Sequence, residues 1–290
     1  DSVRFEALVD AMFDRYAATD NPGCVVGIVK EGQLIYGKGF GAANLDDQTP
    51  ITTRTSFDVA SVSKSFTSVC IALLMDQGLL QPDDDIRRHL PEMHEFDPPI
   101  TVGDLLRCHI GLRDYIFLMQ LAVWPIRSGW VNYSSADVYQ ILSTQQTLHF
   151  PTGTKFGYSN SDYFLLGQIV ERVSGQPLAR FAHENIFRPL GMRDTGFVDQ
   201  PELVRPNRAV GYVIGRGGFE SWFSTGSVMG AVGIRTTLED LMRWDQNFYD
   251  NRLAAGERIN EFVREGQVAG NRFCLDVDAF LKKVKPDANL

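Results

Sequence analysis

A serine and a lysine three positions apart, Ser61 and Lys64, are the residues of this sequence whose types and spacing most directly suggest chemistry. A serine hydroxyl is a weak nucleophile until a base removes its proton, and a lysine kept neutral by burial can be that base. In a helix, residues three apart lie on one face, so the Lys64 amine would reach the Ser61 hydroxyl. Apolar residues recur at helical spacing through the same stretch: Val62, Phe66, Val69 and Leu73.

The stretch from Phe57 to Leu80 is therefore predicted to contain a buried central helix that ends at Gly78, with Ser61 in its first turn. The N–H groups at the start of a helix favour developing negative charge, which suits a nucleophile placed there. A single Ser-x-x-Lys spacing also arises by chance. The alternative is a helix-capping serine near a surface lysine.

A second candidate group, Tyr158-Ser159-Asn160, lies in a polar turn just before a predicted helix. Side chains two apart in an extended segment point to the same side, so the phenol and the amide would face one site. The phenol can relay a proton, and the amide can hydrogen-bond a substrate carbonyl. This pattern is also short: Tyr249-Asp250-Asn251 matches it and is interpreted as a helix end.

Composition excludes several classes of protein. The chain has 290 residues, 44% hydrophobic and 22% charged, with a net charge of −8 and acidic residues spread along it. There is no basic patch for nucleic acid and no apolar run of the roughly 20 residues that a membrane span needs. The chain opens at Asp1-Ser2-Val3. This start fits a periplasmic or secreted protein whose leader was removed better than a cytoplasmic one, or else a chain shortened at its N-terminus.

The cysteines and histidines predict neither a disulfide framework nor a metal site. The four cysteines contain no Cys-x-x-Cys pair, and Cys24 and Cys70 lie in apolar runs typical of buried free thiols. The five histidines show no metal-ligand spacing. We therefore expect no metal and no cofactor.

The remaining elements that must position these residues follow from hydrophobic periodicity and turn residues. A helix is expected over 2–19, and a β-hairpin over 24–40, turning at Glu31-Gly32-Gln33. The chain is then mainly helical to about residue 200. Further predicted elements are a short helix ending near Gly111, helices at 134–144, 159–173, 178–187 and 238–249, a strand at 209–214, a glycine-rich loop at 215–233, a helix at 259–268 and a strand at 273–280.

Ser61-x-x-Lys64 followed about a hundred residues later by Tyr158-x-Asn160 resembles the serine β-lactamase and penicillin-binding protein family. Its class C, family VIII esterase and D-aminopeptidase branch is the most similar. Blocks that resemble this family cover roughly residues 20–250: 58–64, 100–106, Pro151-Thr152-Gly153, Tyr158-Ser159-Asn160-Ser161, Pro189-Leu190-Gly191-Met192 and 233–241.

The resemblance implies an α/β (α+β) fold of the β-lactamase/transpeptidase type, with an antiparallel sheet flanked by terminal helices and an inserted all-helical region. The domains would be 1–57 with 205–290 for the sheet and 58–204 for the helices. It further implies that Ser61 is the acylated nucleophile, Lys64 its base or base partner and Tyr158 a proton shuttle. Asn160 would orient the substrate, and the Ser61 N–H would be one oxyanion donor.

One family motif, Lys-Thr-Gly or His-x-Gly on a strand after the last matching block, has no counterpart in this sequence. His109-Ile110-Gly111 precedes Tyr158, and Ser224-Thr225-Gly226 lacks the cation. The segment 272–281 is a candidate for the missing strand, without that motif. Three explanations remain open: a truncated or divergent C-terminus, another group in the same role, or loss of catalysis. Loss of one oxyanion donor costs about 10²–10³ in rate, so slow acylation would survive.

The sequence therefore predicts a serine hydrolase that acts through an acyl-enzyme on a small-molecule or peptide substrate carrying an amide, peptide or ester bond. Esterase or D-peptidase activity is favoured over efficient β-lactam hydrolysis, because the cation expected to hold a β-lactam carboxylate is not found. The alternative is a catalytically impaired binding protein that keeps the penicillin-recognition fold. No oligomeric state is predicted.

Overall fold

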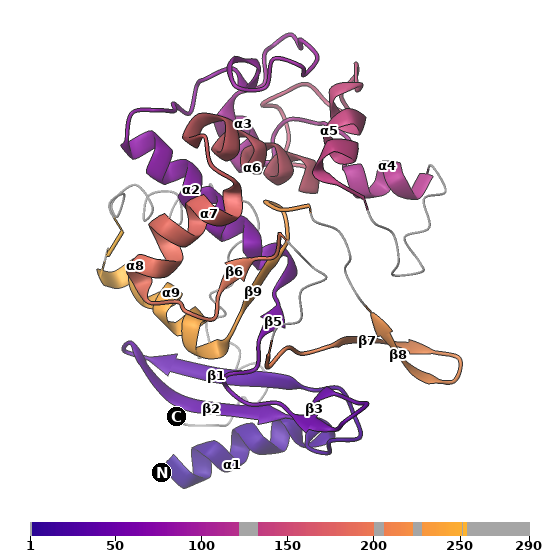
Figure 1. Ribbon diagram of the computed structural model, residues 1–290, viewed down its shortest axis with the longest axis vertical. Helices are drawn as coiled ribbons and strands as arrows, with labels where there is room; N and C mark the ends of the chain where they lie inside the picture. The colour runs from indigo at the N-terminus through magenta and orange to yellow at the C-terminus, as the bar shows by residue number, and fades with distance from the viewer. Residues whose placement is uncertain (1, 122–132, 200–205, 223–227, 251, 254–290) are drawn as a thin grey trace.

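A β-hairpin between two helices forms one end of the molecule in the computed structural model, which describes residues 2–121, 133–199, 206–222, 228–250 and 252–253 (Figure 1). Strands β1 (Cys24–Lys30) and β2 (Gln33–Phe40) pair antiparallel. Glu31 and Gly32 both have positive φ, as a two-residue hairpin turn requires. The predicted hairpin is confirmed.

Helix α1 (Ser2–Phe13) covers one face of this hairpin, and helix α9 (Leu238–Asp250) contacts β1. Val9 of α1 forms a small apolar core with Tyr36 and Phe40 of β2. Gly27 lets α9 lie close to β1, because a Cβ atom there would require the side chain of Leu238 to move. The hairpin is thus held by helices from both ends of the described chain.

A three-stranded antiparallel sheet connects this end to the helices. Its order is β5 (Phe57–Asp58), β9 (Ile234–Thr236) and β6 (Gly196–Phe197). Strand β5 ends three residues before Ser61. Position 61 is therefore fixed to a strand that pairs with residues more than 170 positions later.

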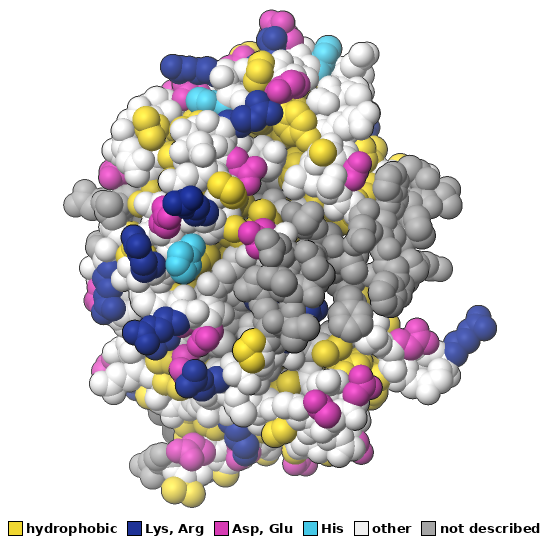
Figure 2. Space-filling model, viewed as in Figure 1, with side chains coloured by type: hydrophobic (Ala, Val, Ile, Leu, Met, Phe, Trp, Pro, Cys, Tyr) yellow, Lys and Arg dark blue, Asp and Glu magenta, His cyan; other side chains and the backbone are white. Residues whose placement is uncertain are grey.

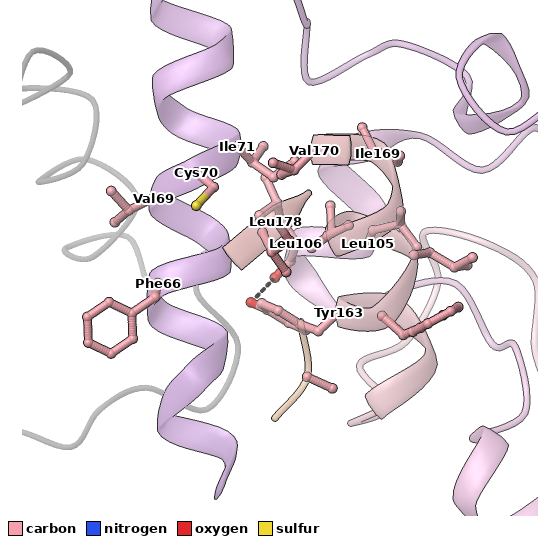
Figure 3. Close-up of a cluster of buried hydrophobic side chains, with 14 of the residues drawn as sticks. Phe66, Val69, Cys70, Ile71, Leu105, Leu106, Tyr163, Ile169, Val170 and Leu178 are labelled. Carbon is pink, nitrogen blue, oxygen red and sulfur yellow. Dashed lines mark hydrogen bonds between the residues drawn. The ribbon is translucent and has the colours of Figure 1, made fainter. Parts of the chain in front are cut away.

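Helix α2 (Ser63–Asp76) lies at the centre of the molecule, and 12 of its 14 residues are buried. It packs against helix α6 (Asn160–Ser174) through an apolar interface that includes Ile71 and Val170, with Tyr163 of α6 donating to the Leu106 carbonyl (Figure 3). On another side of α2, Phe66 stacks on Trp244 of α9, with ring centroids 4.2 Å apart. The predicted buried central helix is confirmed.

Local sequence explains the starts of the other main helices. Thr101 and Asp104 form a capping box at α3, and Ser134 and Asp137 form one at α5. The Ser159 hydroxyl caps α6. The remaining bounds are α3 Val102–Arg107, α4 Tyr115–Leu121, α5 Ser135–Ser143, α7 Leu178–Ala182, α8 Arg188–Leu190, β3 Ala42–Asn44, β4 Thr49–Pro50, β7 Gly211–Gly215 and β8 Gly218–Trp222.

The predictions for residues 215–233 and for the first turn at Ser61 are wrong. The predicted loop at 215–233 contains β8, which pairs antiparallel with β7 to make a second hairpin that projects from the body of the molecule (Figure 1). Phe219 and Trp222 of β8 favour a strand, but the glycines around them led to the prediction of a loop. Ser61 lies not in an α-helical turn but in a preceding 3₁₀ turn, Ala60–Val62, because the chain must leave β5 sharply before α2 begins.

Several sequence predictions fall outside the described residues, namely the helix at 259–268, the strand at 273–280 and the candidate segment 272–281. The proposed domain division stays a prediction, and β6 pairs with the sheet although it lies within the range given to the helical domain. Basic and acidic side chains are interspersed over the visible face (Figure 2). Within the described ranges, no helix combines the length and apolar character needed to cross a membrane.

Candidate active site

Ser61 is presented by a sharp turn between a strand and a helix. Ala60, directly before it, has φ of +44°, a left-handed conformation that costs a non-glycine residue roughly 1–2 kcal/mol. The Asp58 carboxylate accepts from the Ala60 N–H at 2.9 Å and holds this conformation. The Ser63 hydroxyl donates to the Ala60 carbonyl and accepts from the Ile234 N–H of β9. The turn is thus fixed on both sides.

The Lys64 amine is buried and contacts three oxygen atoms. Its Nζ lies 3.2 Å from Ser61 Oγ, 2.9 Å from Asn160 Oδ1 and 3.0 Å from the carbonyl oxygen of Ala231. Only 1% of the lysine surface is exposed. The predicted pairing of Ser61 with Lys64 is therefore present, and the alternative of a surface lysine is excluded.

This arrangement accommodates both protonation states of Lys64. The ammonium form has three N–H donors for three acceptors. The neutral amine has two N–H groups and one lone pair. The Asn160 and Ala231 oxygens can only accept, so they take the two N–H groups and leave the lone pair directed at Ser61. The geometry is that of an amine able to remove the serine proton.

Tyr158 also contacts the Ser61 hydroxyl, from the loop just before α6. Its hydroxyl donates to Ser61 Oγ at 2.7 Å, and its ring lies 4.8 Å from Lys64 Nζ. Tyr158 is 46% exposed, whereas Lys64 is buried. Ser61 therefore stands between an inner amine and an outer phenol, each within hydrogen-bond distance of the hydroxyl.

Asn160 is the first residue of α6, and both ends of its side-chain amide are engaged. Its Oδ1 accepts from Lys64, while its Nδ2 donates to Asp114 Oδ2 at 2.8 Å. The four residues predicted from sequence thus lie together. The substrate-orienting role of Asn160 stays a prediction. One lone pair of Oδ1 and one N–H of Nδ2 are used by Lys64 and Asp114, which leaves the second lone pair and the second N–H for a ligand.

Sequence reasoning missed two groups of the site, Ala231 and Asp114. The Ala231 carbonyl reaches Lys64 because Gly230 and Gly233 adopt φ near +105° and fold this segment onto α2 and α6. A Cβ atom at Gly230 would collide with the Tyr163 carbonyl, so a larger residue is excluded there. The available signal was the glycine spacing in Gly230-Ala231-Val232-Gly233.

The segment after α3 supports the loop that carries Tyr158. Cys108 has a left-handed backbone at the C-terminus of α3, and its carbonyl accepts from the Gly157 N–H. The carbonyls of His109 and Gly111 accept from Gly153 and His149. Residues 108–111 are therefore a structural support for residues 149–157. Helix α3 ends at Arg107, earlier than the predicted end near Gly111.

Asp162, in the first turn of α6, is a buried carboxyl group close to the site. Neither of its oxygens has a hydrogen-bond partner of good geometry among the described residues. Burial raises its pKa well above the usual value, and the Asp114 charge adds to this, while the nearby side chains of Ser159 and Cys108 oppose it. Burial also raises the pKa of the Cys108 thiol, to about 12. The protein immediately around Asp162 and Cys108 therefore disfavours negative charge.

We expect Asp162→Asn to stabilise the protein at neutral pH but not at acidic pH. A carboxyl whose pKa is raised by folding holds its proton more tightly in the native state, so its contribution to stability falls as pH rises above the unfolded value near 4. The difference in melting temperature between the variant and the wild type should therefore grow from pH 4 to pH 8 and reach a few degrees. Thermal melts across this range measure it.

Asp137→Asn is the matched control, because Asp137 occupies the same helix position in α5 but is only partly buried. Hydrogen bonds from Ser134 lower the pKa of Asp137. Its stabilising effect is therefore present above the unfolded pKa, and the control variant should lose stability at neutral pH. Identical melting curves for Asp162→Asn and the wild type at every pH would contradict the assignment of Asp162 as a destabilising buried carboxyl.

The sequence matches the family model described as Beta-lactamase over residues 9–272. The chain belongs to the beta-lactamase family. It is 28% identical over 257 residues to a D-aminopeptidase of Gluconobacter oxydans, covering 87% of this chain and 46% of that protein. It is 35% identical over 186 residues to a putative D-alanyl-D-alanine carboxypeptidase of Escherichia coli, covering 59% and 42%.

The fold is that of solved structures in this group. The octameric penicillin-binding protein homologue from Pyrococcus abyssi aligns with a TM-score of 0.77 at 23% identity, covering 90% of this chain and 60% of that one. The predicted family and fold class are thus confirmed. The chain spans less than half the length of the two curated relatives. The candidate strand for the third family motif, residues 272–281, lies outside the described residues.

Proposed function

We propose that this beta-lactamase family protein is a serine hydrolase that forms an acyl-enzyme on Ser61 with amide, peptide or ester substrates. The observation that carries the proposal is the position of Ser61 Oγ, 3.2 Å from Lys64 Nζ and 2.7 Å from the Tyr158 hydroxyl. A nucleophile in contact with a base that is itself held by other groups is the arrangement that covalent catalysis requires.

The reaction follows from these contacts. Lys64, as the neutral amine, accepts the Ser61 proton while Oγ attacks the substrate carbonyl carbon and the carbonyl bond pair moves to its oxygen. When the tetrahedral intermediate collapses, the bond to the leaving amine or alcohol breaks. Tyr158, on the exposed side, is placed to relay to that leaving group the proton that Lys64 took from Ser61, so Lys64 is again neutral and Tyr158 again a phenol. Water then attacks the acyl carbon and gives up a proton to Tyr158 and Lys64, and the bond to Ser61 Oγ breaks. Oγ takes that proton back, which releases a carboxylic acid and restores Ser61.

Peptides or amides of D-amino acids are the substrate class we propose to test first, with simple esters second. The D-aminopeptidase and the putative D-alanyl-D-alanine carboxypeptidase support this choice, since their names refer to D-configured substrates. The exposed Tyr158 leaves the serine accessible from one side, whereas Lys64 is covered by protein.

A fluorophosphonate probe tests the proposed nucleophile directly. The wild-type protein should gain one adduct by intact-mass spectrometry. Trypsin should release it on the peptide spanning residues 55–64, which also contains Ser56 and Ser63. Fragmentation should place the adduct on Ser61. No adduct, or an adduct on another serine, would contradict the proposal. Saturable binding of a D-amino acid amide without an adduct would instead favour the binding-protein alternative.

A further inference from the structure

Asp114, just before α4, is a buried carboxylate whose two oxygens both accept from N–H donors. Its Oδ2 accepts from the Asn160 backbone N–H at 2.6 Å and from Asn160 Nδ2 at 2.8 Å. Its Oδ1 accepts from the Ile116 N–H at 2.8 Å. Only 9% of the residue surface is exposed. The carboxylate is thus oriented by α4 and directed at the first residue of α6.

This contact determines which end of the Asn160 amide faces the lysine. A carboxylate only accepts hydrogen bonds, so the amide end beside Asp114 must be the NH₂ group. The oxygen of the same amide then points at Lys64, where an N–H donor is available. With the amide reversed, the NH₂ group would face the lysine N–H and the oxygen would face a carboxylate, and both contacts would be lost.

We infer that Asp114 is a positioning residue for the hydrolase: by fixing the orientation of the Asn160 amide, it fixes the Lys64 amine against Ser61. The catalytic part of this inference depends on the proposed function. Asp114 does not touch Ser61 in any hydrogen bond between described residues, and its effect passes through Asn160. Its hydrogen bonds are charge-assisted, a class that contributes more than neutral ones.

Other hydrogen bonds, which do not involve the Asp114 carboxylate, hold the same part of the fold together. The Ser161 hydroxyl accepts from the Tyr115 N–H at 2.9 Å and donates to the Arg113 carbonyl at 3.0 Å. These bonds join the segment before α4 to α6 without involving the Asp114 carboxylate. Tyr115 is also fully buried. We therefore expect Asp114→Ala to fold, and Ser161→Ala is a matched control that weakens the same junction without touching the Asn160 amide.

The first test is the rate of fluorophosphonate labelling in a double-mutant cycle. Asp114→Ala should slow labelling about 10- to 100-fold, the range for hydrogen bonds to a charged group. In an Asn160→Ala background, it should change the rate by less than about twofold, because residues that act through one another are not additive. Ser161→Ala should slow labelling much less. The inference would be overturned if the double variant were slowed by the product of the two single-variant factors. It would also be overturned if Asp114→Ala and Ser161→Ala slowed labelling equally.

The second test does not depend on catalysis. In ¹⁵N-labelled protein, the side-chain NH₂ signal of Asn160 can be assigned by its absence in Asn160→Ala. This signal should shift and exchange faster with solvent in Asp114→Ala, but not in Ser161→Ala. An unchanged Asn160 signal in Asp114→Ala overturns the positioning role even if labelling is slowed. If the wild type is not labelled but the signal changes as expected, the proposed function fails while the positioning of Asn160 stands.

Discussion

Ser61→Ala is expected to abolish fluorophosphonate labelling and to reduce turnover of a D-amino acid amide or ester by at least about 10⁴-fold. The variant removes the oxygen atom to which both the Lys64 amine and the Tyr158 hydroxyl are hydrogen-bonded. Loss of the nucleophile cannot be compensated by the remaining groups, which retain only binding and electrostatic contributions. Intact-mass spectrometry and steady-state kinetics measure the two effects.

Ser65→Ala is the matched control for this substitution. Ser65 lies in the first turn of α2, four residues after Ser61, and its hydroxyl donates to the Val62 carbonyl at 2.8 Å rather than to a site residue. Labelling and turnover should be close to those of the wild type. Adduct formation that persists in Ser61→Ala would show that the nucleophile lies elsewhere and would remove the basis of the proposed function.

Lys64→Met should slow acylation about 10²–10⁴-fold, the usual contribution of a general base. Methionine keeps much of the length and apolar stem of lysine but provides no amine for the Ser61 proton. The variant also leaves the Asn160 and Ala231 oxygens without their donor, which costs roughly 1–3 kcal/mol of stability. Labelling rates should therefore be measured well below the melting temperature of the variant.

Lys155→Met provides the comparison for this effect. Lys155 is exposed in the loop before Tyr158 and makes no hydrogen bond or ion pair among the described residues. Its replacement changes the net charge by the same amount as Lys64→Met and should leave the labelling rate within about twofold of the wild type. Equal rates for Lys64→Met and the wild type would show that Lys64 is not the base that removes the serine proton.

The fold could be predicted where local sequence and burial agree. Val69 and its apolar neighbours predicted α2 because a helix buried on nearly all sides needs apolar residues all round. The Glu31-Gly32 turn predicted the first hairpin through its backbone requirements. By contrast, β5, β6 and β9 are only two or three residues long, and their pairing depends on partners far away in the chain. Such short strands leave no periodic signal to read.

The sequence by itself determined which chemical groups are present: a hydroxyl and an amine one helical turn apart at 61 and 64, and a phenol and an amide at 158 and 160. Only the tertiary structure decided that these two pairs meet and that Lys64 is buried. It also decided that Ala231 and Asp114 complete the set of contacts. The physical reason is that the Ala231 carbonyl and the Asp114 carboxylate become partners of Lys64 and Asn160 only when the chain packs. An alanine or a single aspartate at those positions does not by itself indicate an active-site contact.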